Sequence, residues 1–337
     1  MVVETAFSKE LKLRFPLIVA PMFLVSNAEM IKAAIDNKVM GVFPTLNFRK
    51  DGELEKVLTE IKEYDQQNGG LGHYGVNLIV QQSNPLYSKH LKICIEQKVP
   101  FYITSLGNPT DVIEAAHEYG GKVFCDVTNL KHAQKVADAG ADGFIAVAQG
   151  AGGHAGPNPM NILIPALKKR FPNIPVIAAG GIAHGNAIAS SLTLGAEGVS
   201  MGTRFIASKE ATVNDAYKEA IVEAGMDDIV MTTKLSGTPS SVINTDEAKK
   251  IGLKQNFLER WLSKNKKTKK YFKMWVQYLG MKKLEKSVAA NNYKRIWSAG
   301  KSVHMIEDIS PMSEIIKRLE DETIASIQET NSLLKDK

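Results

Sequence analysis

Short apolar runs alternate with longer stretches of helical periodicity along the first two thirds of this 337-residue chain. The runs are rich in Val, Ile and Phe, which is typical of strands buried in a parallel sheet that helices cover on its faces. Eight such runs can be counted, at residues 17–20, 40–43, 74–80, 100–105, 122–127, 142–147, 174–178 and 197–201. A helix is expected after each run, at about 27–37, 52–66, 85–97, 109–119, 129–139, 159–170, 184–194 and 208–224.

Eight consecutive β/α units predict an α/β protein with a closed (β/α)8 TIM barrel, whose ligands bind at the carboxyl ends of the strands. An open, doubly wound sheet stays an alternative because periodicity does not report closure. Ser26 or Asn27 is expected to cap one helix, and Gly120, Gly140 and Gly195 to end others.

The sequence pattern changes after the eighth unit. Residues 1–225 are expected to form the barrel, residues 226–306 a mainly helical insertion near the active site, and residues 307–337 a C-terminal helix that packs back on the barrel. The insertion carries a lysine-rich face over 257–290 and the aromatic residues Tyr271, Phe272, Trp261 and Trp275.

Composition excludes several classes of protein. The net charge of +6 comes largely from one lysine run at residues 264–273, which we interpret as a solvated face because no nucleic-acid motif accompanies it. Two cysteines, Cys94 and Cys125, are too few for a disulfide framework and lack metal-ligand spacing. No signal peptide or membrane span is recognisable, so we expect a cytoplasmic protein without a metal, nucleic-acid or membrane partner.

Glycine-rich turns follow the seventh and eighth predicted strands, where barrels bind phosphate. Gly180 and Gly181 end the seventh strand, and Ser200-Met201-Gly202-Thr203 follow the eighth. Glycines let backbone N–H groups approach phosphate oxygens, and a helix N-terminus beyond them would add a favourable dipole. We therefore expect an anion site here rather than two plain turns.

A histidine flanked by glycines ends the sixth strand, in the string Gly150-Ala151-Gly152-Gly153-His154-Ala155-Gly156. Such flanks leave the imidazole uncrowded and let the backbone bend around a planar ligand, and an imidazole titrates near neutral pH. We interpret His154 as functional rather than as an inert loop residue.

Other strand ends carry weaker signals. Asn77 is a polar residue inside the third strand, and it either faces a ligand or satisfies a neighbouring turn. Asp126 at the end of the fifth strand could likewise bind a ligand or hydrogen-bond a neighbouring turn. Met22 and Cys125 by themselves indicate packing.

The segments PLIVAPM, GVNLIV, ADGFIAVAQGAGGHAG, PVIAAGGIAHG, LGAEGVSMGTRF and WSAGKSV occur in this order from residue 16 to about 303. Together they resemble the nitronate monooxygenase family, formerly called 2-nitropropane dioxygenases, which are FMN-dependent TIM-barrel flavoproteins. The same superfamily includes flavin-containing enoyl-ACP reductases and NADH:quinone reductases. The combination of motifs is more specific for the superfamily than for one activity.

The resemblance implies roles for individual residues. It makes His154 the catalytic residue, and it assigns FMN binding to residues on five strand ends, namely Pro21, Met22, Asn77, Gln149, Gly152, Gly153, Gly180, Gly181, Ser200, Met201, Gly202 and Thr203. The chain departs from the family pattern at Gln149-Gly150-Ala151, at His184 and at Lys301. His184 could be only a helix cap, and Lys301 could place a charge near the flavin or point to solvent.

The implied activity is oxidation of an alkyl nitronate or nitroalkane by electron transfer to FMN and reaction with O2. The closest rival is an NAD(P)H-dependent flavin reductase of the enoyl-ACP or quinone reductase type on the same barrel. A barrel that binds a phosphate ligand without flavin is the rival from a different class, because the glycine pairs alone specify only an anion. Use of NAD(P)H and a homodimer both stay open.

Overall fold

The computed structural model describes residues 1–81, 83–234, 239–253, 279 and 296–334. Eight parallel strands close into a barrel in chain order, with the last strand paired to the first. This confirms the predicted barrel and excludes the open sheet. The strands are β1 (Leu17–Val19), β2 (Met40–Pro44), β3 (Tyr74–Ile79), β4 (Phe101–Ser105), β5 (Lys122–Val127), β6 (Gly143–Val147), β8 (Val176–Ala179) and β9 (Gly198–Met201).

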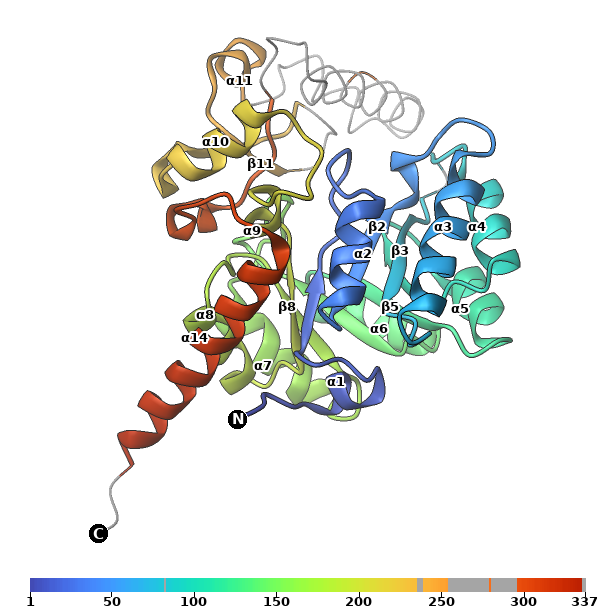
Figure 1. The fold of residues 1–337 in the computed structure, drawn as a ribbon, viewed down its shortest axis with the longest axis horizontal. Helices are drawn as coiled ribbons and strands as arrows, with labels where there is room; N and C mark the ends of the chain where they lie inside the picture. Colours follow the sequence, from blue (N-terminus) through green and yellow to red (C-terminus); the bar gives the residue numbers. More distant parts are fainter. Residues whose placement is uncertain (82, 235–238, 254–278, 280–295, 335–337) are drawn as a thin grey trace.

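Helices surround the barrel (Figure 1). They are α2 (Ala28–Asp36), α3 (Glu53–Gln67), α4 (Tyr87–Glu96), α5 (Thr110–His117), α6 (Leu130–Asp138), α7 (Met160–Arg170) and α8 (Gly185–Thr193), with the short η1 (Thr45–Asn47) after β2. The side chain of Asn27 caps α2 by accepting a hydrogen bond from Met30 N. Of the two predicted caps, Ser26 and Asn27, the structure therefore selects Asn27. Gly120, Gly140 and Gly195 have φ of +83°, +90° and +101°, so each supplies the left-handed turn expected after its helix.

Two cores hold the barrel together. One lies between strands and helices, and the other fills the lumen with inward side chains such as Met40, Ile103 and Ile145. The N-terminal helix α1 (Ala6–Glu10) closes the amino end of the lumen, where Phe7 packs edge-on against Phe124 with 5.6 Å between ring centroids. Ligands are thereby directed to the opposite, carboxyl end, which we call the mouth.

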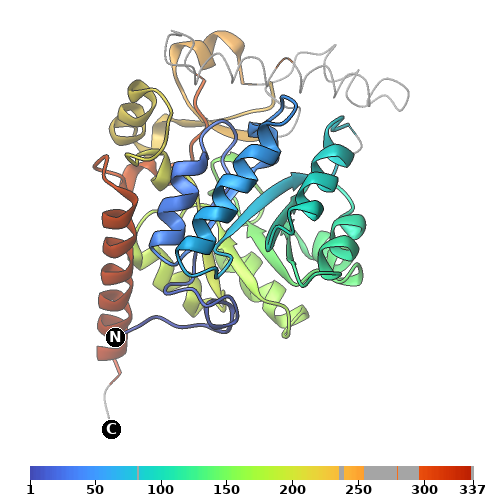
Figure 2. The ribbon, with the colours of Figure 1, turned by 45° about the vertical axis from the view of Figure 1, so that its right-hand side comes forward.

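The eighth outer helix differs from the sequence prediction of 208–224. After β9 the chain forms the single turn α9 (Thr203–Ile206) and an irregular stretch, and α10 (Asp215–Glu223) begins only where the side chain of Asn214 caps it by accepting from Tyr217 N at 2.8 Å. The C-terminal helix α14 (Met312–Ser332) instead packs between α8 and α2 on the barrel wall (Figures 1 and 2). A helix distant in sequence therefore completes the outer layer.

A smaller unit lies over the mouth (Figure 1). It contains α10, η2 (Met226–Asp228), β10 (Ile229–Thr232), β11 (Ser240–Ile243), α11 (Asp246–Ile251) and η3 (Lys301–Met305). The lysine-rich helix predicted over 257–290 lies, except for residue 279, outside the described residues, and so do its aromatic residues. Among the helices that the structure does describe, none is both long and apolar enough to cross a bilayer.

Candidate active site

The inward side chains of the barrel become polar at the mouth. Strand register and alternation from the lumen core place Asn77 on β3, Ser105 on β4, Asp126 on β5 and Ser200 on β9 in this position. On β6 and β8 the same position holds the apolar Val147 and Ala179. We call these six residues the mouth ring, and its polar side spans three adjacent strands, β3 to β5.

A hydrogen-bonded chain joins the polar side of the mouth ring. Asn77 Nδ2 donates to the carbonyl of Ile103 at 3.1 Å and to Ser105 Oγ at 2.8 Å. Ser105 Oγ donates in turn to Asp126 Oδ2 at 2.5 Å. Burial raises the pKa of Asp126 to about 6, although the Ser105 hydroxyl opposes the shift. This carboxyl therefore changes its charge close to neutral pH.

The predicted flavin-facing loop after β1 is held in place by side chains of the chain itself. Met22 N donates to Ser26 Oγ at 2.9 Å, and Asn47 Nδ2 donates to the carbonyls of Met22 and Ser26 at 3.2 and 2.8 Å. Met22 Cγ and Sδ would lie 3.5 Å from a Cβ at Gly202. Met22 thus stands beside the predicted phosphate turn after β9, and Pro21 precedes it in the loop.

The glycines after β6 and β8 pack backbone against backbone. A Cβ at Gly150 would come within 2.9 Å of Gly181 Cα, and one at Gly180 within 2.6 Å of Ala151 N. Gly180 and Gly181 also have φ of +108° and +80°, a region that side chains disfavour. Both loops therefore require glycine, and the structure brings the two predicted glycine motifs into contact.

A third segment completes this cluster, and sequence reasoning did not assign it there. Gly300 N donates to Thr203 Oγ1 at 3.1 Å, and a Cβ at Gly152 would lie 2.7 Å from Gly300 N. Thr203 Oγ1 thus accepts a hydrogen bond from the segment that returns to the barrel at residues 296–310, which we call the returning chain. The glycine in WSAGKSV was the only signal that could have indicated this close approach.

Three of the four residues predicted to bind FMN at the end of β9 face different ways. Ser200 is inward in the mouth ring, whereas the side chain of Met201 is buried in the outer core and its carbonyl accepts from Ala20 N at 2.9 Å. Gly202 precedes α9. The side chain of Met201 is therefore not placed to meet a ligand at the mouth.

His154 lies on a two-residue strand, β7 (Gly153–His154), that leaves the barrel. It pairs antiparallel with β11, with Ser240 opposite His154 and Ser241 opposite Gly153. β10, β11 and β7 form a separate three-stranded sheet. The side chains of His154 and Gln149 are exposed, so the unit over the mouth fixes the backbone of the histidine loop and leaves the imidazole accessible.

The expected helix dipole at the phosphate turn is not available at α8. That helix begins at Gly185, whose N–H donates to Glu322 Oε2 of α14 at 2.7 Å. The protein therefore supplies its own anion at this N-terminus. His184 occupies the N-cap position, but its side chain makes no capping hydrogen bond, and α9 is only four residues long.

Two other predicted residues have clear positions. Lys301 is exposed and begins η3 directly after Gly300. Cys125 is buried behind the mouth and accepts from Thr104 Oγ1 at 3.1 Å, and burial raises the pKa of its thiol to about 12. Cys125 is therefore a packing residue, as its sequence context indicated.

The mouth has the features that a flavin nucleotide needs. A Cβ at Gly181 would meet only Gly150 Cα, at 3.7 Å, and one at Gly153 would meet nothing within 4 Å, so both glycines border open space. Within the described ranges, no hydrogen bond is donated by the N–H of Gly181 or of Gly202. Unpaired N–H groups at glycine turns fit a phosphate, and the residues present are thus compatible with this group.

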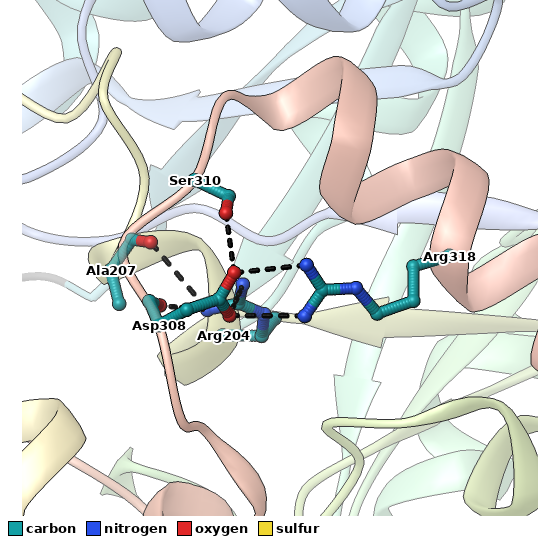
Figure 3. Close-up of polar contacts among 5 residues, drawn as sticks. All are labelled: Arg204, Ala207, Asp308, Ser310 and Arg318. Atoms are coloured by element: carbon teal, nitrogen blue, oxygen red, sulfur yellow. Dashed lines mark hydrogen bonds and ion pairs between the residues drawn. The ribbon is translucent and has the colours of Figure 1, made fainter.

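The ion pairs behind the phosphate turn were also missed from sequence. Arg204, almost fully buried on α9, donates to Asp308 Oδ1 at 2.8 Å and to the Asp308 carbonyl at 2.9 Å (Figure 3). Arg318 of α14 donates to both carboxylate oxygens of Asp308 at 3.1 and 2.9 Å, and Ser310 also donates to this carboxylate. These contacts tie α14 and the returning chain to the turn after β9.

Comparison with known proteins supports the sequence resemblance. A family profile described as nitronate monooxygenase matches residues 46–322. A (3aS,4S,5R,7aS)-5-hydroxy-7a-methyl-1-oxo-octahydro-1H-indene-4-carboxyl-CoA dehydrogenase from Mycobacterium tuberculosis is 30% identical, with 74% of this chain and 69% of the relative covered. A probable nitronate monooxygenase from Staphylococcus saprophyticus is 35% identical over 46% of this chain and 47% of its own length.

A solved structure is similar over nearly the whole chain. FabK from Thermotoga maritima superposes with a TM-score of 0.84 at 30% identity, covering 98% of this chain and all of that one. The likeness therefore extends beyond the barrel to the unit over the mouth and the C-terminal helix.

Proposed function

Because the chain belongs to the nitronate monooxygenase family and is a flavin-dependent oxidoreductase, we propose that its flavin is FMN and that it oxidises a small alkyl nitronate beside His154. O2 would be the second substrate. The two relatives reported above are named for different substrates, a carboxyl-CoA and a nitronate. The nitronate is therefore the part of the proposal that needs its own test.

The observation that supports this proposal most strongly is that three glycine-containing segments meet at one side of the mouth. Gly150 packs on Gly181, and Gly152 packs on Gly300. The N–H of Gly300 in turn donates a hydrogen bond to Thr203 Oγ1. The FMN phosphate would lie on the N–H groups of Gly181 and Gly202, and the ring against Pro21, Met22 and Gly153. Ser200 and Asn77 would contact the cofactor from the mouth ring.

When bound, FMN supplies the redox chemistry, and the protein supplies orientation and charge. A protonated His154 would bind the nitronate anion, whereas a neutral His154 would remove the α-proton of a neutral nitroalkane. The two roles have opposite consequences. Activity that falls as pH rises indicates the cation, and activity that rises indicates the base.

The test begins with the purified protein, which should be yellow and should release FMN on denaturation. The holoenzyme is then mixed anaerobically with propionate 3-nitronate, NADH or NADPH, and loss of flavin absorbance near 450 nm is followed in single turnovers. Bleaching by the nitronate at catalytic rates supports the proposal. Bleaching by NADH or NADPH alone contradicts the nitronate and favours a reductase.

A second candidate is redox chemistry on a CoA thioester. It is favoured by the relative from Mycobacterium tuberculosis, which is named as a carboxyl-CoA dehydrogenase and matches 74% of this chain, against 46% for the probable nitronate monooxygenase from Staphylococcus saprophyticus. The same anaerobic assay, run with saturated and unsaturated acyl-CoA thioesters, separates the two candidates.

A further inference from the structure

The chain of hydrogen bonds from Asn77 to Asp126 has a direction that chemistry fixes. The carbonyl of Ile103 can only accept, so the group of Asn77 that faces it at 3.1 Å is the amide nitrogen. The same nitrogen donates to Ser105 Oγ at 2.8 Å. Both protons of the Asn77 amide are therefore used within the barrel wall.

Ser105 has one hydroxyl proton, and it goes to Asp126 Oδ2 at 2.5 Å. The hydroxyl thus accepts from Asn77 and donates to Asp126. An ionised Asp126 strengthens this arrangement, because hydrogen bonds to charged acceptors are stronger than neutral ones. The carboxyl acts on the amide through the serine.

The oxygen of the Asn77 amide is left for a ligand. No described residue donates a hydrogen bond to Asn77 Oδ1. The atom is also not fully enclosed, because it is absent from the set of enclosed polar atoms without a partner. Asn77 Oδ1 is therefore accessible from the mouth. Asn77 consequently offers an acceptor, and no donor, to whatever occupies the mouth.

Packing alone does not require this polar chain. The other side of the mouth ring holds Val147 and Ala179, so apolar side chains fit this depth of the barrel. Within the part of the chain that the structure describes, no charged residue perturbs Asp126, whose neighbour on β6 is Ile145 and on β4 is Ser105. A partly buried carboxyl with no cationic partner among the described residues is costly, which indicates a functional reason for it.

We propose that Asp126 is a positioning residue for the cofactor: through Ser105 it holds the Asn77 amide with Oδ1 toward the mouth, where it pairs with a hydrogen-bond donor of the flavin. The donors of FMN are the N3–H of the ring and the hydroxyls of the ribityl chain. The inference rests on the proposed FMN site, and it adds Ser105 and Asp126 to the residues that determine flavin affinity.

The test measures the FMN dissociation constant of the apoprotein from quenching of flavin fluorescence. Ser105→Ala interrupts the chain and should weaken FMN binding about tenfold. Ser105→Thr keeps the hydroxyl and should restore most of the affinity. Thr104→Val is the matched control, because it removes a hydroxyl one residue away that bonds Cys125 on the outer side of the same strands.

A pH profile separates positioning from a structural role. Asp126→Asn should bind FMN about as tightly as wild type at pH 5 and about tenfold more weakly at pH 8, since only the wild type gains an ionised acceptor between these values. The FMN phosphate titrates in both proteins, so the ratio of the two dissociation constants isolates Asp126. A ratio that stays constant from pH 5 to pH 8 would overturn the proposal.

The two levels of failure are distinguishable. Equal FMN affinity in wild type, Ser105→Ala and Thr104→Val contradicts the positioning role and leaves the FMN site intact. A wild-type apoprotein that takes up no FMN contradicts the proposed cofactor and this role together.

Discussion

Single glycines decide whether the mouth stays open at the turn after β8, the proposed phosphate site. Gly181 has φ of +80° and free space where a side chain would stand, whereas Gly150 has no such space. The two positions thus need glycine for different reasons: Gly150 for contact between loops, and Gly181 for its backbone angle and for access by a ligand.

Gly181→Ala should therefore weaken FMN binding about tenfold or more while lowering stability by only about 1–2 kcal/mol. The added methyl group would lie in the space of the phosphate. Gly120→Ala is the matched control, since its φ is +83° and its Cβ would meet nothing within 4 Å, at the end of the barrel opposite the mouth. Equal FMN affinity in the two variants would show that the phosphate lies elsewhere. Fluorescence titration and thermal unfolding provide the two readouts.

His154→Ala should keep FMN and lose turnover by roughly 100-fold or more, the range of a lost acid–base group. The backbone pairing of β7 with β11 does not depend on the imidazole, so the fold should persist. His184→Ala serves as the control, because that side chain caps no helix. Steady-state rates and flavin content are measured together, and a His154→Ala enzyme with wild-type rates would remove His154 from the mechanism.

At the scale of elements, α8 depends on a partner that is far away in sequence. Gly185 approaches α14 so closely that a Cβ would lie 2.3 Å from Glu322 Cβ, and Glu322 caps the first N–H of α8. The helix after the proposed phosphate-binding turn is therefore positioned by the C-terminal helix.

Glu322→Gln should lower the free energy of unfolding by about 1 kcal/mol, because the neutral amide is a weaker cap than the carboxylate. In a chain of this size the melting temperature should fall by roughly 2 °C or more. Glu329→Gln, an exposed position on the same helix, should leave it unchanged. Equal melting temperatures for both variants would contradict the capping role.

At the scale of the whole molecule, Asp308 joins the barrel to the C-terminal helix (Figure 3). Its carboxylate accepts from Arg204 on α9 and from Arg318 on α14. The hydrogen bonds from Arg318 are the main reason that its pKa falls from 3.8 to about 2, which Ser310 and Arg204 reinforce. The contact stabilises the fold as long as Asp308 is ionised.

Asp308→Ala should destabilise the protein by roughly 3 kcal/mol at pH 7, since it leaves Arg204 buried without its carboxylate. A lowered pKa in the folded state contributes stability that is present above the unfolded value of 3.8 and is lost as pH falls toward 2. The difference between wild type and variant should therefore shrink over this range, as measured by urea unfolding. Asp321→Ala, which removes only an exposed pair with Lys317, is the control, and it should cost less than about 1 kcal/mol.

Much of the fold was accessible from local pattern. The eight strands were predicted within a few residues of their observed positions, because each is a short apolar run bounded by turn residues. The eighth helix was extended too far, although Asn214 followed by Asp215 was a recognisable start. No local pattern could show that α14 would take the place of that helix.

The candidate site was predictable where chemistry depends on residue type. The paired glycines Gly180 and Gly181 and a histidine flanked by glycines are visible in the sequence, and the structure gives both paired glycines a positive φ. Asp126 was left open between a ligand and a neighbouring turn, and Ser105 was not distinguishable from an ordinary strand residue, since the role of both depends on which strands become neighbours. The outward direction of Met201 likewise follows from register.

The sequence by itself determined the alternation of strands and helices and the places where the backbone must be glycine, because periodicity and allowed φ are local properties. Tertiary structure alone decided closure of the barrel, the pairing of β7 with β11, and the contacts of Asn77 with Ser105 and of Arg204 with Asp308. Such contacts join residues distant in the chain, and their energies depend on burial and direction that exist only after folding.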